Sequence, residues 1–269
     1  MKMRWLTIYA VAYLVFLYAP IVILPLFAFN ESSIIAFPLT GFTTNWFREL
    51  VGVEAMIAAL RHSLFIAVVS AILATTLGIL ASRAATRHKF PLKGGIMGMI
   101  MLPLVLPEII VGVSLIVVIV QIFGLGLRSW TVIEAHTLIC IPFSIAILNS
   151  AFQNLDVSLE EAAVDLGETP WSTFRLITLP LVMPGIISSL LISFTISLDE
   201  FIIAFFLTGN DPTLPVYVWG LFRFPQRIPV VMALGTILVA VSIILLTIAE
   251  YFRRRGVARA GQKDTGGFL

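Results

Sequence analysis

Long apolar runs of this 269-residue sequence contain the carboxylates Glu108, Asp199 and Glu200. Glu108 directly follows Pro107, and Asp199 and Glu200 are adjacent in a later run. Placing one carboxylate near the centre of a bilayer costs about 2.5–3.5 kcal/mol on insertion scales, so such groups face the protein interior or a wet cavity. We predict that Glu108 and Asp199 line a translocation path that favours cations, and that Glu200 contributes less directly.

A structural role is the alternative for the same carboxylates: they would accept hydrogen bonds from a broken helix or pair with an arginine of a partner subunit. His136 lies in another apolar run, where hydrogen bonding between helices is expected in preference to a proton relay. No second histidine or cysteine stands at ligand spacing, so no metal site is expected. The single cysteine, Cys140, excludes an intrachain disulfide and is expected to be a packing residue.

The sequence has no phosphate-binding loop and no nucleophile–base pair. The nearest match, residues 256–264, lacks the required Gly-Lys-Ser/Thr and follows an apolar run instead of a buried strand. We therefore expect no enzymatic activity and no cofactor in this chain, so any ATP must be bound by a different chain.

One polar stretch, from Glu160 to Pro184, interrupts the apolar sequence and predicts two short helices at an angle. Ser158 is the expected N-cap of the first, with Glu161 three residues later as in a capping box. Gly167 can supply the left-handed residue that ends this helix. Two small residues, Ala162 and Ala163, would allow close approach by another protein, although an ordinary helical connection is the alternative.

The second helix is expected to begin at Thr169, since proline fits the first helical turn and Pro170 follows. Pro180 and Pro184 are expected to limit it. The whole connection, residues 153–183, would lie outside the membrane.

This stretch resembles the signature loop of the membrane subunits of bacterial ABC importers. The signature is Glu-Ala-Ala, three residues, Gly, nine residues, Ile, one residue and Leu-Pro. The matching positions are Glu161, Ala162, Ala163, Gly167, Ile177, Leu179 and Pro180. Three flanking segments, residues 42–47, 106–108 and 197–201, resemble the second permease subunit of the polyamine-importer branch. The similarity extends from about Tyr9 to Tyr251.

The resemblance implies a type I permease fold working with a second, related permease. It further implies two copies of a cytoplasmic ATPase, which would bind ATP and Mg, and an extracytoplasmic solute-binding protein. The helix Glu160–Gly167 would sit in a groove of the ATPase, with Glu161 at its rim. Ile177, Leu179 and Pro180 would anchor the loop on the membrane domain. Spermidine or putrescine is the implied substrate, with an amino-acid-like compound as the alternative.

Composition independently indicates a polytopic membrane protein, because 59% of residues are hydrophobic and only 12% are charged. A soluble domain is about half apolar and a quarter charged. Six runs reach the roughly 20 apolar residues that a spanning helix needs, which predicts an all-α protein with a single permease domain over residues 1–269. The runs are about Leu6–Phe29, Ser63–Ala81, Ile96–Phe123, Thr131–Phe152, Gly185–Leu207 and Pro229–Tyr251.

Lysines and arginines predict the orientation, because they concentrate on the cytoplasmic side of membrane proteins. With six spans, 12 of the 17 fall on the side of both termini. The termini and the Glu160 loop are thus expected in the cytoplasm, and the resemblance implies a location in the bacterial inner membrane. Arg253, Arg254 and Arg255 are expected to contact anionic lipid headgroups and not nucleic acid.

Two other features bear on the fold. Pro103 and Pro107 should interrupt the third span, and Trp46, Phe47 and Leu50 share one face of a predicted short helix. That helix is expected on the membrane surface, with docking of a delivery protein as the alternative. A stand-alone secondary transporter or channel is the competing function class, but it leaves the matched cytoplasmic loop unexplained.

Overall fold

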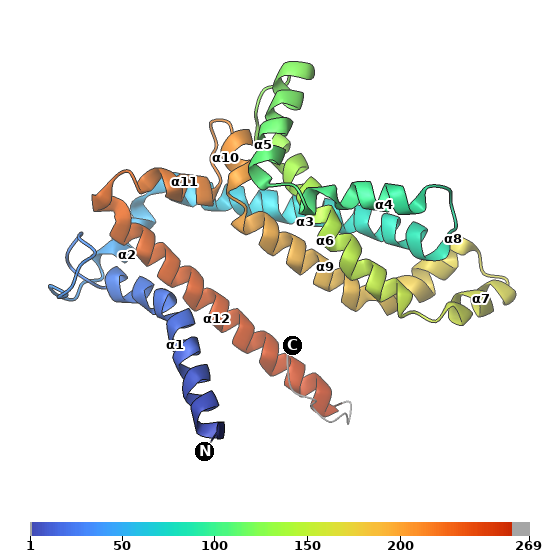
Figure 1. The fold of residues 1–269 in the computed structure, drawn as a ribbon, viewed down its shortest axis with the longest axis horizontal. Coiled ribbons are helices and arrows are strands. Elements are labelled where there is room, and N and C mark those ends of the chain that lie inside the picture. The colour runs from blue at the N-terminus through green and yellow to red at the C-terminus, as the bar shows by residue number, and fades with distance from the viewer. Residues whose placement is uncertain (1, 260–269) are drawn as a thin grey trace. The chain divides into compact units, whose positions relative to one another are not determined.

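The computed structural model describes residues 2–259, with side chains from residue 5 to residue 244. Its regular elements over that range are helices, accompanied by one isolated β-bridge (Figure 1). This confirms the all-α prediction. The chain forms two compact units, the first comprising residues 1–54 and 218–269 and the second residues 55–217. That residues 1–269 act as one permease domain stays a prediction.

In the first unit, α1 (Lys2–Ala28) and α2 (Asn45–Gly52) both pack against α12 (Ile228–Arg259), which follows the 3-10 turn Pro225–Arg227. The predicted short helix is therefore confirmed as α2, and its Leu50 is buried. The Trp46 indole donates to the backbone oxygen of Asn30, 2.8 Å away. A position on the membrane surface stays a prediction for this helix.

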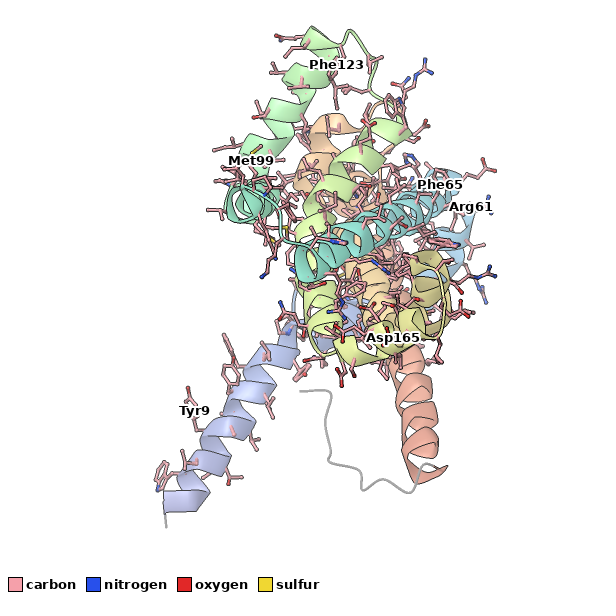
Figure 2. The ribbon with its side chains drawn as sticks, turned by 90° about the vertical axis from the view of Figure 1, so that its right-hand side faces the viewer. Tyr9, Arg61, Phe65, Met99, Phe123 and Asp165 are labelled. Atoms are coloured by element: carbon pink, nitrogen blue, oxygen red, sulfur yellow. The ribbon has the colours of Figure 1, made fainter. Side chains whose placement is uncertain are left out.

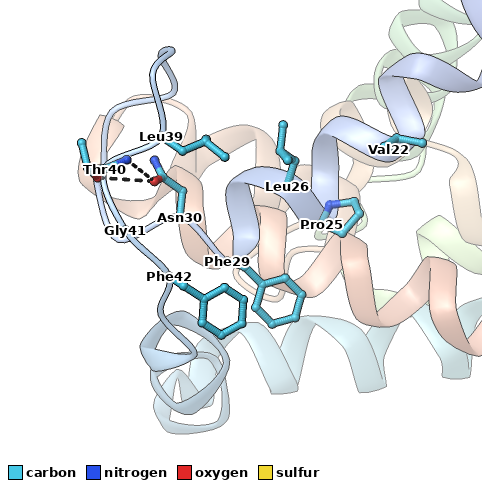
Figure 3. A pocket seen from close by; sticks show the side chains of 9 residues that line it. All are labelled: Val22, Pro25, Leu26, Phe29, Asn30, Leu39, Thr40, Gly41 and Phe42. Atoms are coloured by element: carbon cyan, nitrogen blue, oxygen red, sulfur yellow. Dashed lines mark hydrogen bonds between the residues drawn. The ribbon is translucent and has the colours of Figure 1, made fainter.

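A largely apolar cavity of about 640 Å³ lies where α1 ends and the following loop folds back (Figure 3). Asn30 closes this corner: its Oδ1 accepts from the backbone N–H of Thr40 at 3.0 Å, while its side chain is buried. The rings of Phe29 and Phe42 stack across it, with centroids 5.2 Å apart. These contacts hold the loop against the end of α1.

The second unit is built on α3 (Glu54–Arg87), α6 (Ser129–Gln153) and α9 (Leu179–Asp199), and α6 runs alongside α9 (Figure 1). Buried hydroxyls link all three helices. Ser189 of α9 lies 3.0 Å from Thr75 of α3 and 2.7 Å from Ser144 of α6. Such polar contacts stabilise helix packing where lipid provides no hydrophobic driving force.

The third predicted span, Ile96–Phe123, is not one straight helix. It consists of α4 (Lys93–Met101), a 3-10 turn at Leu102–Leu104, α5 (Glu108–Ile116) and a π-helical turn at Val117–Ile122. The two halves are bent by 99°. The expected interruption by prolines is thus confirmed, because Pro103 lies in the 3-10 turn and Pro107 precedes α5. Met99 and Phe123 are exposed on this bent pair (Figure 2).

The fifth predicted span, Gly185–Leu207, has the wrong limits. One helix runs continuously over Pro170–Asp199, comprising α8 (Pro170–Thr173), a π-helical turn (Phe174–Thr178) and α9. Pro180 and Pro184 do not end it. Pro180 is the second residue of α9, which begins at Leu179 directly after the π turn, and the helix continues through Pro184.

This helix stops at Asp199, because Glu200 has an extended backbone conformation with ψ 123°. A short helix, α10 (Ile202–Leu207), follows, and α11 (Leu214–Leu221) lies beyond it. The apolar run from Phe201 to Leu207 therefore belongs to a separate helix, and packing against α5 replaces continuation of α9.

Five described helices are long and apolar enough to span a membrane, and the bent pair α4–α5 makes up to six. This agrees with the predicted six spans. The five helices are Trp5–Ala28, Glu54–Arg87, Ser129–Gln153, Pro170–Asp199 and Pro225–Ile244.

Candidate functional site

The loop between α6 and α9 contains the short helix α7 (Val157–Asp165). Its N-cap is Asp156, and the predicted capping box at Ser158 is wrong. Asp156 Oδ1 accepts the backbone N–H of Ser158 at 3.0 Å, so the helix begins earlier than expected. This N–H, together with the Ser158 side chain, holds the pKa of the Asp156 carboxyl below its usual range.

Gly167 ends α7 as predicted. Its φ of +93° lies in the left-handed region that glycine adopts without steric cost. The N–H of Gly167 donates to Val164 O at 2.9 Å, and the N–H of Glu168 donates to Ala163 O at 3.0 Å. This pair of bonds is a Schellman motif, which satisfies carbonyl groups at the end of the helix.

Thr169 begins the next helix, also as predicted. Its Oγ1 accepts from the backbone N–H of Ser172 at 3.2 Å, and Pro170 occupies the first turn. The Ser172 hydroxyl donates to the carboxylate of Glu168. The chain thus reverses sharply between two capped helix ends.

The tip of this loop exposes both polar and apolar side chains. Glu161 and Ala162 are exposed, whereas Ala163 is buried, so the two alanines do not share one open face as expected. Adjacent helical residues point about 100° apart, which explains the difference. Leu166 is 86% exposed and Trp171 is 69% exposed. The tip therefore exposes large apolar side chains beside carboxylates.

The base of the loop, which comprises Glu160 and residues 177–179, is packed against the rest of the second unit. Ile177 and Leu179 are partly buried, and Leu179 packs against a cluster that includes Phe152 and Val182. Pro180 is exposed and does not join this packing. The predicted anchoring of the loop on the spans stays a prediction as a functional role.

Glu160 occupies the centre of the base. Arg87 Nε of α3 donates to Glu160 Oε2 at 2.6 Å, and the Thr178 hydroxyl donates to Oε1. Sequence reasoning selected Glu160 but missed both partners, which are 73 and 18 residues away along the chain. No local pattern around Arg87 or Thr178 signals these contacts.

Of the carboxylates predicted for a translocation path, Glu108 and Asp199 are exposed and lie at helix breaks. Glu108 is the first residue of α5, where negative charge is favourable. Asp199 is the last residue of α9, where the helix dipole disfavours it. Sequence reasoning missed Glu134, an exposed carboxylate near the start of α6. The sequence did contain a signal for Glu134, because it is an acidic residue inside the predicted span Thr131–Phe152.

Glu200 differs from its neighbour because it is buried and its oxygens are engaged. Oε1 accepts from the backbone N–H of Ile203 and Oε2 from that of Ala204, both at 2.9 Å. His136 Nε2 lies 3.4 Å from Oε2, and its Nδ1 lies 2.8 Å from Ser197 Oγ. Glu200 therefore caps α10, and His136 links α6 to α9 as expected.

The exposed residues of the predicted site thus lie in two features: the loop between α6 and α9, and the carboxylates at helix ends. Among the described residues, no group of three or more histidine, cysteine, aspartate or glutamate side chains is placed to hold a metal ion. A cleft of about 320 Å³ beside the loop is lined by residues of the α3 end and of α7, including Arg83, Arg87, Glu161 and Asp165.

Comparison with known proteins identifies the family. The family described as "binding-protein-dependent transport system inner membrane component" matches residues 74–256. The putrescine transport system permease protein PotI of Escherichia coli (strain K12) is 38% identical over 259 residues, covering 91% of this chain and 92% of PotI. The spermidine/putrescine transport system permease protein PotC of Shigella flexneri is 33% identical over 253 residues, covering 94% and 93%.

The molybdenum transport system permease protein ModB of Haemophilus influenzae is 31% identical over 222 residues, covering 77% of this chain and 97% of ModB. A solved structure with the same fold belongs to a bacterial alginate ABC transporter in complex with an alginate-pentasaccharide-bound periplasmic protein. Its matched chain has a TM-score of 0.74 at 21% identity, and 94% of each chain is covered. The chain therefore belongs to the binding-protein-dependent transport system inner membrane components, as an ABC importer permease of the PotC and PotI type.

Proposed function

We propose that this chain carries polyamines into the cytoplasm, driven by a separate ATPase that docks on the loop Glu160–Pro180. The coupling role is supported by the difference between the exposed tip of the loop and its tightly bound base. Its tip exposes Leu166 and Trp171, whereas its base is held by Glu160. Exposed apolar side chains on a short capped helix suit insertion into a hydrophobic groove of a partner protein, and tryptophan is among the residues that contribute most to binding at such interfaces.

In this proposal the loop and both termini lie in the cytoplasm, as the lysine and arginine distribution favours. Two ATPase copies bind ATP and Mg, and a second, related permease completes the membrane domain. A binding protein delivers substrate from outside. Closure of the ATPases displaces α7, and the spans change between inward-open and outward-open states.

The polyamine assignment is supported by two independent observations. The PotI and PotC relatives are named for putrescine and spermidine transport. Glu108 and Asp199 place exposed carboxylates at helix breaks, and Glu134 adds a third, so a path lined by them favours cations. The ModB relative is named for molybdenum transport, so a molybdenum-containing solute is the second candidate. Exposed carboxylates on the path would disfavour any negatively charged solute.

The docking role is tested by co-purification of the ATPase with the intact permease pair. Leu166→Asp places a charge on the apolar tip and should abolish co-purification, because the docked carboxylate would be buried without a partner. Glu168→Gln, two residues away, is the matched control and should retain the ATPase. Retention of the ATPase by the Leu166 variant would refute docking at this tip.

The substrate is tested by ATPase activity of the assembly in lipid with its binding protein, using spermidine, putrescine, an amino acid and molybdate. Stimulation of ATP hydrolysis by a polyamine is expected.

The path is tested by uptake in two variants. Glu108→Gln and Asp199→Asn should each lower uptake at limiting polyamine by about tenfold, equivalent to about 1.4 kcal/mol. Unchanged uptake in both variants would refute the path, and stimulation only by another solute would refute the polyamine assignment.

A further inference from the structure

The carboxylate of Glu160 is held on both of its oxygens by two different transmembrane helices. Arg87, the last residue of α3, donates to one oxygen at 2.6 Å. Thr178, in the π turn of the helix Pro170–Asp199, donates to the other. The Arg87 and Glu160 side chains are each only 13% exposed, so solvent screens their attraction less than that of a surface pair.

Arg87 also holds the chain that enters the loop. Its Nη2 donates to the backbone oxygen of Leu155 at 3.4 Å, and Leu155 is buried in the cluster that includes Phe152. One turn earlier on α3, the Arg83 guanidinium lies over the ring of Phe174, 4.3 Å from its centroid. Residues four apart share one helix face, so α3 contacts the loop on both its entry and its exit.

The loop therefore consists of an exposed tip and a base fixed to α3. A loop with a free base would absorb a push on its tip by bending, because few contacts oppose local movement. Charge-assisted hydrogen bonds to one carboxylate oppose that bending and are among the stronger polar contacts in proteins. A displacement of α7 must then displace the end of α3 and the start of the helix Pro170–Asp199.

We propose that Arg87 is a positioning residue for transport, which transmits displacement of the docking helix α7 to α3 through Glu160. This inference rests on the proposed docking function. Its particular claim is that the ion pair Arg87–Glu160 determines how much solute moves for each ATP hydrolysed. It does not determine whether the ATPase binds.

The test uses the assembled transporter in proteoliposomes, with uptake and ATP hydrolysis measured on the same sample. Arg87→Gln and Glu160→Gln should retain the co-purified ATPase and hydrolyse ATP within about twofold of the natural protein. Uptake per ATP should fall at least fivefold in each. The double variant Arg87→Glu with Glu160→Arg restores an ion pair of reversed polarity and should recover at least half of the natural ratio.

Lys89→Gln is the matched control, because it removes a positive charge from an exposed position two residues beyond Arg87. Its uptake per ATP should not change.

A second readout is the distance between spin labels at His88→Cys and Asp165→Cys, which line the same cleft. With the natural Arg87–Glu160 ion pair present, the distribution of label distances should stay narrow with and without ATP. It should broaden when Glu160 is replaced by Gln.

Unchanged uptake per ATP in both single variants would overturn the proposal, as would a reversed pair no better than either single variant. Loss of the ATPase from the Glu160→Gln complex would also overturn it, since Glu160 would then be a docking residue. Failure of the docking function itself has a different signature: the Leu166→Asp variant would retain the ATPase.

Discussion

Replacing Glu200 by alanine should destabilise the transporter, although an adjacent carboxylate, Asp199, can be neutralised at little cost in stability. Glu200 accepts two backbone N–H groups at 2.9 Å, from Ile203 and Ala204. Both donor residues are fully buried, so water does not replace the lost acceptor. Alanine at position 200 therefore leaves two N–H groups unpaired at the start of α10.

The magnitude follows from these two bonds. A hydrogen bond to a charged group contributes about 1.5–3 kcal/mol, and loss of a helix cap costs about 0.5–2 kcal/mol. We expect Glu200→Ala to lower the free energy of unfolding by about 2–4 kcal/mol. The midpoint of thermal unfolding should fall by about 5–15 °C for a chain of this length. Glu200→Gln retains one acceptor oxygen and should show about half of this loss.

The assay is thermal unfolding of the assembled complex, followed by intrinsic fluorescence. Asp199→Asn is the control, because its side chain is exposed and should change stability by no more than about 0.5 kcal/mol. Equal losses in the two variants would refute the assignment of Glu200 as a cap. A shift below about 2 °C for Glu200→Ala would also refute it, since the shift expected for 2 kcal/mol is larger.

Two further predictions concern helix packing and the loop. Gly78→Ala should destabilise the complex by about 1–3 kcal/mol, because the added Cβ would overlap Ser144 Oγ. Gly98→Ala is the control and should not destabilise it, because no atom lies near that position. Equal thermal unfolding midpoints for the two variants would contradict this packing. Asp156→Ala should loosen α7, measured by amide hydrogen exchange at Ser158. Since the Asp156 pKa is depressed, its contribution is present above the unfolded pKa of about 3.9 and is lost as pH falls through the folded value. Equal exchange rates in the natural and variant proteins at neutral pH would argue against the cap.

Local signals in the sequence were sufficient for several elements. Gly167 and the pair Thr169–Pro170 predicted both sides of the loop reversal, because caps and turns depend on residues a few positions apart. Pro103 and Pro107 predicted the interrupted third span for the same reason. The apolar runs similarly located six candidate spans, since a helix that crosses lipid needs a continuous apolar sequence, although the limits of the fifth were wrong.

Contacts between distant residues were not predictable in this way. The Arg87–Glu160 pair joins positions 73 residues apart, so neither residue's neighbours signal the other. The break at Glu200 was hidden because apolar residues continue on both sides of it. A carboxylate beside another in an apolar run was the available signal, but only its burial and two N–H partners distinguish the cap from its exposed neighbour.

The π turn at Phe174–Thr178 has a consequence for how such permeases diverge. It joins the loop to the helix that continues through α9, and a π turn is wider than an α-helical turn. Each residue of an α-helix rotates the chain by about 100°. Loss of one residue from regular α-helix would rotate the loop by about that angle, whereas loss of one residue from the π turn would convert it into a regular α-helical turn and leave the loop facing the same way. The π turn is then a position where the length of this helix can change by one residue without redirecting the loop relative to the spans.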